Sequence, residues 1–496
     1  MAFLHASSSI IPRVFRRFVP TAALVLLAGT GLSLLPPCLA QSGSWTPTGD
    51  MVEARHWHAA TLLHNGRVLV EGGSNSFGVR LSAEIYDSVK RNWRQTTSMN
   101  IARELHTATL LPDGRVLVAG GYVSPDGSVA SAELYNPATG TWSFTGSMSD
   151  ARNRHRAGLL ANGNVLVAGG VDEDNLELAS AEIYDPTTGT WSLTGSMTTT
   201  RNKHTMTGLA DGRVLVTGGE MNFQTTLSSA EIYDPATGVW TATGSMSVRR
   251  VDHTATLLSN GKVLVAGGSI FGTEKTCELY DPANGTWTAT GSMNASRNSH
   301  TAVLQHDGTV LVAGGEDPDL KSTELYDPTT GTWSLAGDLE DQRTGQTLTR
   351  LADGTTLVAG GVKTFSTTLN TAEIYTPANL GPMNVNASGT FNSSSGTATF
   401  SMDVSGTHGI PTGSLSYSDP NANVTFSRVR LRKLTISGNT ATITGLATLD
   451  NGTGRVAFTV TAVDKSADGS TDTLSVTLNN GYSASGTLTS GNITIQ

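Results

Sequence analysis

The chain contains 496 residues, which is too many for a domain built around one hydrophobic core, so several domains or a repeat array are expected. Glycine is abundant at 55 residues and only 15% of residues are charged, which favours turn-rich β-structure over helix bundles. The formal net charge of −9 argues against nucleic acid as a partner.

The first forty residues resemble an export signal rather than a folded segment. Arginines between positions 13 and 17 precede an apolar run at 21–35, which is too short to span a bilayer comfortably. Cys38-Leu39-Ala40 then supplies small residues for signal peptidase. We predict a signal peptide over 1–40 and a secreted protein (extracellular, cell-surface or periplasmic) without stable membrane insertion; an uncleaved anchor is the alternative.

From residue 44 to residue 376 the chain repeats one phrase seven times, as in "HTATLL", "RVLVAGG", "SAELYNP" and "TGTW". The first two segments of every copy are joined by Asn-Gly or Asp-Gly, the pairs that suit a two-residue hairpin turn. A Gly-Gly pair ends the second segment. Each copy therefore predicts a meander of four strands.

Units of 46 to 49 residues with Gly-Gly, Tyr and Trp at fixed offsets resemble kelch repeats. Seven such units imply a seven-bladed β-propeller, which we place at 41–380. "SGSWTP" at 42–47 is a Trp strand without a unit, and the seventh unit, ending with "TAEIYTP" at 371–377, has no Trp strand. We expect the N-terminal strand to complete the last blade and close the ring.

An arginine precedes the first strand of every unit, and a glutamate lies in the third strand of every unit. We predict a repeated structural Arg to Glu interaction; an anion-binding ring is the alternative. The arginines are Arg55, Arg103, Arg152, Arg201, Arg250, Arg297 and Arg343. The glutamates are Glu84, Glu133, Glu182, Glu231, Glu278, Glu324 and Glu373.

Six of these arginines are followed three residues later by histidine. Equivalent positions around a seven-blade ring cannot converge on one zinc ion, so we expect no metal site there. The histidines are His58, His106, His155, His204, His253 and His300, with Gln346 in the seventh unit.

Length varies between units only in the segment from Gly-Gly to the third strand, so one face of the ring carries variable loops and the other carries standard turns. Five of the loops contain an aromatic residue, which could contact sugar rings or peptide side chains, or could pack against its own loop. These residues are Phe77, Tyr122, Phe223, Phe271 and Phe365.

Further candidates lie beside the first strands. His56 and Trp57 follow the first arginine, and Arg154, Lys203 and Asp252 take the position of Trp57 in later units. We expect this position to line the channel mouth, where a lack of sevenfold uniformity suits a specific site.

Residues 383–496 are rich in Ser, Thr, Asn and Gly and alternate polar with apolar residues, which predicts an immunoglobulin-like β-sandwich. Asp464, Asp468 and Asp472 could hold calcium, although a solvated turn is the simpler interpretation. The predicted fold is therefore all-β, a propeller followed by a sandwich.

Two classes of function fit this organisation. The architecture is similar to galactose oxidase, whose copper site uses a Tyr crosslinked to Cys, a second Tyr and two His, but Cys277 and His408 match none of its motifs. A sugar epimerase such as a sialic acid mutarotase would need an acid and a base, which Asp252, His56 and Glu104 could supply. We favour a monomeric binding module for an extracellular protein or glycan, without cofactor or metal, in which Cys277 is a buried thiol.

Overall fold

The computed structural model describes residues 43–269, 272–316, 320–363, 367–378, 383–394, 396–406, 411–426, 428–437, 440–450, 455–465 and 471–495. The proposed signal peptide, Phe271, Phe365, His408 and Asp468 lie outside these ranges. Within the described ranges, no helix is long and apolar enough to cross a membrane.

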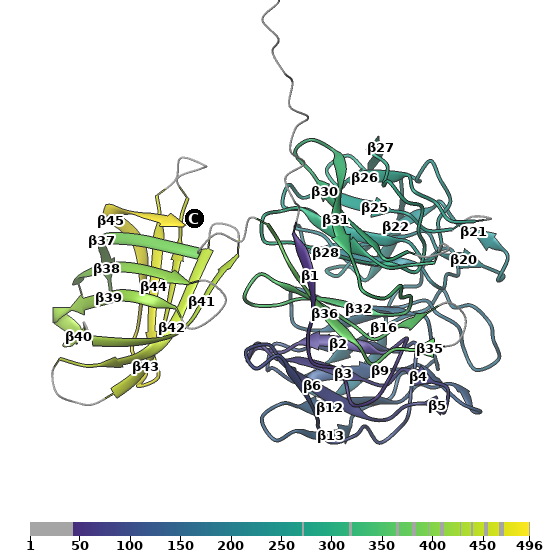
Figure 1. Cartoon of the computed structure of the whole chain (residues 1–496), viewed down its shortest axis with the longest axis horizontal. Coiled ribbons are helices and arrows are strands. Elements are labelled where there is room, and N and C mark those ends of the chain that lie inside the picture. The colour runs from purple at the N-terminus through teal and green to yellow at the C-terminus, as the bar shows by residue number, and fades with distance from the viewer. Residues whose placement is uncertain are drawn as a thin grey trace, which may run out of the picture. The chain divides into compact units, whose positions relative to one another are not determined.

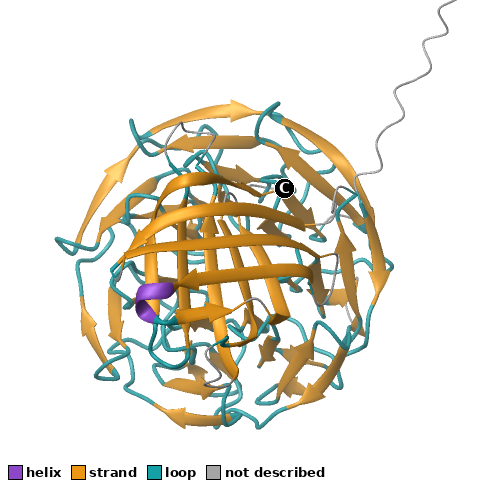
Figure 2. Ribbon diagram, turned by 90° about the vertical axis from the view of Figure 1, so that its left-hand side faces the viewer, coloured by secondary structure: helices purple, strands orange, loops and turns teal. Residues whose placement is uncertain are grey.

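The first large part of the chain is a propeller of seven four-stranded antiparallel sheets, called blades 1 to 7 in the order of their inner strands (Figures 1 and 2). The inner strand of each blade packs against that of the next, and β32 packs against β2 to close the ring. The predicted seven-bladed, all-β propeller is confirmed.

The strands of blades 1 to 4, from the inner strand outward, are as follows. Blade 1 contains β2 (Ala59–Leu62), β3 (Val68–Glu71), β6 (Ala83–Asp87) and β7 (Asn92–Gln95). Blade 2 contains β8 (Thr107–Leu110), β9 (Val116–Ala119), β12 (Ala132–Asn136) and β13 (Thr141–Phe144). Blade 3 contains β14 (Arg156–Leu159), β15 (Val165–Ala168), β16 (Ala181–Asp185) and β17 (Thr190–Leu193). Blade 4 contains β18 (Thr205–Gly208), β19 (Val214–Thr217), β22 (Ala230–Asp234) and β23 (Val239–Thr243).

The remaining blades follow the same pattern. Blade 5 contains β24 (Thr254–Leu257), β25 (Val263–Ala266), β26 (Cys277–Asp281) and β27 (Thr286–Thr290). Blade 6 contains β28 (Thr301–Leu304), β29 (Val310–Ala313), β30 (Ser322–Asp327) and β31 (Thr332–Asp338). Blade 7 contains β32 (Thr347–Arg350), β33 (Thr356–Ala359), β36 (Ala372–Thr376) and β1 (Ser44–Pro47).

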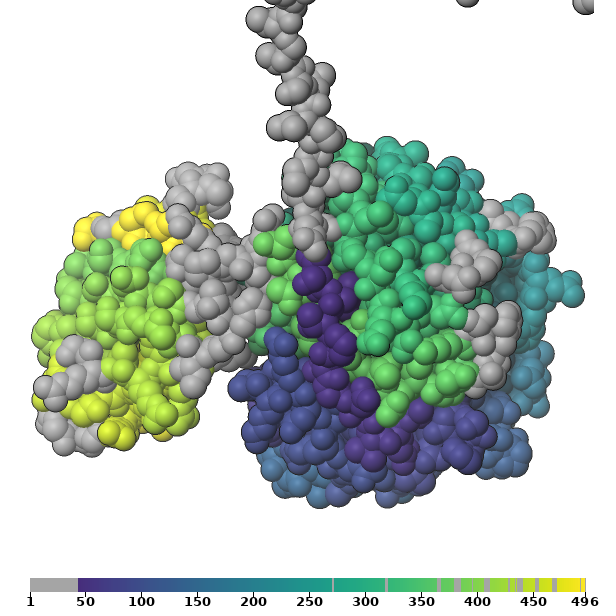
Figure 3. Space-filling view, in the orientation of Figure 1, coloured from purple at the N-terminus to yellow at the C-terminus, as the bar shows by residue number. Residues whose placement is uncertain are grey.

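Strand β1 supplies the outer strand of blade 7, so the two ends of the propeller meet in one sheet. It pairs with β36, and Figure 3 shows this purple segment lying against green residues. The Trp45 ring lies 5.2 Å from the Tyr375 ring, and its indole nitrogen donates to Thr323 Oγ1 at 2.9 Å. Blade 7 thus joins strands from both ends of the ring.

Between neighbouring blades lie the hydrophobic cores, because both faces of each sheet are covered. The second strand of blade 1, for example, is fully buried at Val68, Leu69 and Val70. Gly72 follows with a φ of 66°, and a Cβ there would collide with the carbonyl of Arg103 in blade 2. The Gly-Gly pair therefore permits close packing between blades.

In four blades, the described residues between the second and third strands form a small hairpin. These hairpins are β4 (Ser74–Asn75) with β5 (Gly78–Val79), β10 (Tyr122–Val123) with β11 (Gly127–Ser128), β20 (Glu220–Met221) with β21 (Thr225–Thr226), and β34 (Val362–Lys363) with β35 (Thr367–Thr368). The face that carries them is called the loop face below.

The C-terminal part is a nine-stranded antiparallel sheet around one hydrophobic core. In spatial order its strands are β40 (Val424–Phe426), β39 (Thr412–Asp419), β38 (Gly396–Gly406), β37 (Met383–Ser393), β45 (Ser483–Ile495), β44 (Thr473–Leu478), β43 (Arg455–Val463), β42 (Thr440–Thr448) and β41 (Arg428–Ser437).

This strand order corrects the predicted immunoglobulin-like topology. An immunoglobulin fold needs Greek-key connections between its sheets. Here every pair of neighbouring strands is consecutive in the chain except β37 and β45, which join the two ends of the domain. The domain is an up-and-down meander, and the alternating pattern correctly predicted strands but not their connections.

Candidate functional site

The seven buried arginines anchor the blades. In each blade the arginine Nη2 lies 2.8–3.2 Å from a carboxylate oxygen of the predicted glutamate, and all seven arginines are fully buried or nearly so. In blade 1, Glu84 also accepts hydrogen bonds from the backbone N–H groups of Val52 and Glu53. Each pair therefore fixes the connection that leads into its own blade.

The histidines form bonds between blades rather than a metal centre. In four blades the histidine Nε2 lies 3.0–3.1 Å from a threonine hydroxyl at the start of the preceding inner strand; the pairs are His58 with Thr347, His155 with Thr107, His253 with Thr205 and His300 with Thr254. Burial lowers the pKa of His253 to about 3, so this imidazole is neutral. Among the described residues, no group of His, Cys, Asp and Glu could hold a metal ion.

Blade 1 departs from this pattern. Ala59 stands where five of the other six blades carry threonine, and Glu71 stands at the end of β3, where five of the other six blades carry alanine. His106 Nε2 lies 3.9 Å from Glu71 Oε1, and neither group has a hydrogen-bond partner in the described part of the chain. Burial raises the pKa of Glu71 well above its usual value and lowers that of His106 to about 3.

A ring of backbone hydrogen bonds surrounds the channel mouth at the loop face. The ring is formed by the residues that lie two positions after each arginine. In six of the seven blades, the N–H of this residue donates to the carbonyl of the equivalent residue in the preceding blade, at 2.9–3.4 Å. Each of these residues has a φ between 50° and 63°. The seven are Trp57, Leu105, Arg154, Lys203, Asp252, Ser299 and Gly345, called the mouth ring below.

The mouth ring has uniform backbone geometry and seven different side chains. Trp57 is 46% exposed and covers Gly345, where a Cβ would lie 2.9 Å from the indole. Across the ring, Lys203 Nζ lies 3.1 Å from Glu220 and 3.8 Å from Asp252. Burial raises the pKa of Asp252, so its proton is held more tightly than in water.

A second layer of polar groups lies beside the mouth ring. His56 and Glu104 each form an isolated bridge with the first loop residue of their own blade. Ser74 Oγ lies 3.4 Å from His56 Nε2, and the same side chain lowers the pKa of the Glu104 carboxyl. Burial raises the pKa of Glu104 and lowers that of His56, whose ring lies 4.5 Å from that of Trp57.

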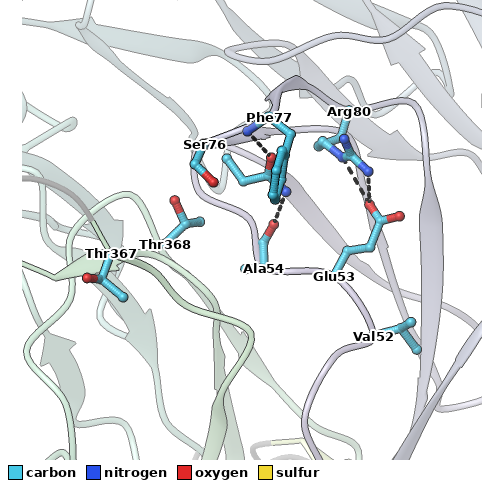
Figure 4. Close-up of a pocket in the computed structure, with 9 residues that line it drawn as sticks. Val52, Glu53, Ala54, Ser76, Phe77, Arg80, Thr367 and Thr368 are labelled. Carbon is cyan, nitrogen blue, oxygen red and sulfur yellow. Dashed lines mark hydrogen bonds and ion pairs between the residues drawn. The ribbon is translucent and has the colours of Figure 1, made fainter.

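A pocket of about 420 Å³ opens on the loop face between blades 1 and 7 (Figure 4). Phe77 stands at its edge with 88% of its surface exposed, and Thr367 and Thr368 line the opposite wall. Arg80 donates two hydrogen bonds to one oxygen of Glu53, at 2.9 and 3.0 Å. The pocket combines an aromatic ring, hydroxyls and a charged pair.

The other predicted loop aromatics lie on separate blades. Phe223 is 46% exposed, and Glu177 of the preceding blade holds its loop by accepting hydrogen bonds from the N–H groups of Asn222 and Phe223. Tyr122 is half-buried in β10, as expected for a ring that packs against its own loop. The described loop aromatics therefore lie in separate loops of the loop face.

Sequence reasoning missed several members of the site. Leu105, Ser299 and Gly345 complete the mouth ring. Ser74 contacts His56, and Glu220 forms an ion pair with Lys203. Leu105, Ser299 and Gly345 each lie two residues after an arginine of the repeat, as Trp57 does, so this spacing could have identified them. Ser74 and Glu220 lie in variable loops, where no repeat register exists.

Two of the carboxylates considered for calcium in the C-terminal domain already accept hydrogen bonds from the backbone. Asp472 is buried and accepts hydrogen bonds from the N–H groups of Lys465 and Ile493 at 2.8 and 2.7 Å. Asp464 accepts one from Ile495 at 3.3 Å. These two side chains satisfy backbone donors in the described structure.

Comparisons with known proteins agree with this architecture. Residues 105–290 match the KLHDC2/KLHL20/DRC7 kelch-repeats domain, and residues 297–340 match the kelch motif. The propeller is built from kelch repeats. The curated protein sequences gave no match.

Two solved structures are similar in fold. The first, a fungal alcohol oxidase of the AA5 family in complex with copper, is 16% identical, with 90% of this chain and all of that chain covered and a TM-score of 0.58. The second is the structure of YjhT, 16% identical over 58% of this chain and 98% of that chain, with a TM-score of 0.47. At this identity the first likeness concerns the fold alone.

The described side chains do not fit a copper centre of the galactose oxidase type. Cys277 is 1% exposed within β26, and burial raises its pKa to about 12, so it is a buried thiol. Four of the six buried histidines bond to a neighbouring blade, and the six do not converge on one point. Among the residues that the structure describes, no cluster supplies the ligands.

Proposed function

We propose that the protein is a secreted kelch-propeller binding module whose loop face recognises a carbohydrate or protein partner, acting as a monomer outside the cytoplasm. The observation that carries this proposal is the exposure of large aromatic side chains. Trp57, Phe77 and Phe223 expose 46%, 88% and 46% of their surface, and all three belong to the loop face. Exposed rings gathered on one face are typical of binding surfaces.

The chemistry around these rings supports the same proposal. The pocket beside Phe77 offers hydroxyls of Thr367 and Thr368, which suit sugar hydroxyls or peptide amides. The mouth ring adds the Lys203 ammonium and the Asp252 carboxyl. A largely preformed face with a few fixed polar groups is what specific recognition requires.

The test is a glycan and protein-partner screen of the purified chain, followed by affinity measurements on two matched variants. Phe77→Ala with Phe223→Ala should weaken binding by about 30-fold or more, since buried aromatic anchors commonly contribute about 2 kcal/mol. Asp113→Asn with Asp211→Asn alters the opposite face and keeps the turn chemistry used at Asn65. Equal affinities for two folded variants would refute the loop face as the site.

A second candidate, a sugar epimerase, is favoured by the linked groups His56, Ser74 and Glu104. A carboxyl with a raised pKa and an imidazole with a lowered pKa can act as acid and base near neutral pH. The measurement is epimer or anomer exchange of hexoses, followed by NMR. Activity that is lost in Glu104→Gln would favour this candidate, and exchange at the uncatalysed rate would remove it.

A further inference from the structure

The C-terminal domain concentrates its positive charge on neighbouring strands. Residues 383–496 contain six Lys and Arg, and five of them lie in β41 or at the start of β43. They are Arg428, Arg430, Arg432, Lys433 and Arg455. Strands β41, β42, β43 and β44 contain no Asp or Glu.

A β-bulge interrupts the alternation of β41. Leu431 and Leu434 are both buried although they are three residues apart, which a regular strand does not allow because its faces alternate. The pairing with β42 shifts between Leu431 and Lys433, so Arg432 is the extra residue. Arg430 and Arg432 are both exposed.

Cross-strand pairing brings a further cation to this surface. Arg428 pairs with Thr448, which pairs in turn with the exposed Arg455. Among the described strands, β41 pairs only with β42, so it is an edge of the sheet. In the described part of the domain, no ion pair neutralises Arg430, Arg432 or Arg455. Clustered like charges repel, and an anionic partner would remove this cost.

The neighbouring side chains indicate the class of partner. The outward residues of β42, β43 and β44 include Thr444, Thr459 and Thr477, whose hydroxyls can bond to sugar hydroxyls. The one aromatic residue of these four strands, Phe458, is buried. The surface thus lacks the stacking rings that bind single-stranded nucleic acid and the aromatic anchors of membrane interfaces.

We propose that the surface formed by Arg430, Arg432, Arg455 and the adjoining threonines binds a linear anionic polysaccharide. Arg430 and Arg432 contact its sulfate or carboxylate groups in a row, since outward residues of a strand repeat about every 7 Å. The threonines contact its hydroxyls. This site belongs to the C-terminal domain, whereas the loop face belongs to the propeller.

The test uses the full chain with heparin and polygalacturonate as probes, dextran as the neutral comparison, and calorimetry at low and high salt. Both anionic polymers should bind, dextran should not, and affinity should fall as salt screens the charges. Arg430→Gln with Arg432→Gln should weaken binding roughly three- to tenfold, the range for two exposed ion contacts. The matched control, Lys90→Gln with Arg94→Gln, removes two exposed charges from the propeller and should bind like the parent chain.

Four outcomes would overturn the proposal. One is unchanged affinity in the β41 variant while its melting temperature matches that of the parent. Another is an equal loss in the control variant, which would indicate a general charge effect. A third is equally tight binding of duplex DNA or of phosphatidylserine vesicles, which would assign the surface to another class of partner. A fourth is binding to neither polymer, which is expected if the charges of this edge strand serve only to prevent aggregation.

Discussion

Arg55 and Trp57 lie two residues apart, and equivalent positions recur in all seven blades, yet the first position is constant and the second is variable. The first position is arginine in every blade, is buried, and bonds to a glutamate. The second position has the same left-handed backbone in every blade and seven different side chains. One position maintains the blade, and the other is free to vary because its side chain meets the channel mouth.

The difference teaches where a repeat protein can change without losing its fold. A buried charge must keep its partner, so the Arg and Glu positions vary together or not at all. A mouth residue contributes to the fold mainly through its backbone N–H and carbonyl, which any residue except proline supplies. Binding chemistry is therefore expected at the mouth ring and in the loops around it.

The largest expected effect comes from opening blade 7. Deleting residues 43–50 removes β1 and the contact of Trp45 with Tyr375, so the ring loses the strand that joins its two ends. We expect a loss of about 5 kcal/mol or more in the free energy of unfolding, measured by denaturant titration. A midpoint equal to that of the parent chain would show that blade 7 does not depend on this strand.

Breaking one buried pair should be the next largest effect. Arg201→Gln leaves Glu231 buried without its cation and should lower the free energy of unfolding by about 3 to 5 kcal/mol. Arg115→Gln breaks the more exposed pair with Asp113 on the opposite face and should cost less than about 1 kcal/mol. Similar losses in both variants would contradict a structural role specific to the buried pairs.

Restoring the repeat pattern in blade 1 should stabilise the protein. Glu71→Ala with Ala59→Thr removes an unsatisfied carboxyl and returns a hydroxyl partner to His106, for a gain of about 1 to 3 kcal/mol.

The gain should depend on pH. Glu71 has a folded-state pKa above its unfolded value, so the parent chain loses stability as pH rises from about 4.3 through the raised folded pKa. The double variant lacks this loss. Its advantage in thermal melts should therefore grow from pH 4 to pH 8, and an advantage that shrinks over this range would contradict the assignment of Glu71.

The smallest effect is expected at the mouth ring. Trp57 is half exposed and its backbone makes the ring bonds, so Trp57→Ala should change the free energy of unfolding by less than about 1 kcal/mol. The variant should nevertheless lose affinity for a ligand found in the partner screen. A large loss of stability would place Trp57 with the buried arginines rather than with the recognition surface.

Spacing alone predicted the blades and the Arg to Glu pairs, because a repeat places equivalent residues in equivalent surroundings. The same register could have placed Leu105, Ser299 and Gly345 beside Trp57. It could not place Ser74 or Glu220, because they lie in loops without a common length. In the C-terminal domain, alternation showed which residues face the core but not that β37 pairs with β45, since alternation carries no information about neighbouring strands.

The central claim, that recognition occurs on the loop face of a uniform scaffold, is tested most directly by covalent footprinting with and without a saturating ligand from the partner screen. Trp57 and Phe77 represent the loop face, and Phe144, 59% exposed on the outer strand β13, serves as a control in the same molecule. The account predicts that the ligand protects Trp57 or Phe77 from labelling and leaves Phe144 unchanged. Protection of Phe144 with continued labelling of both Trp57 and Phe77 would contradict it.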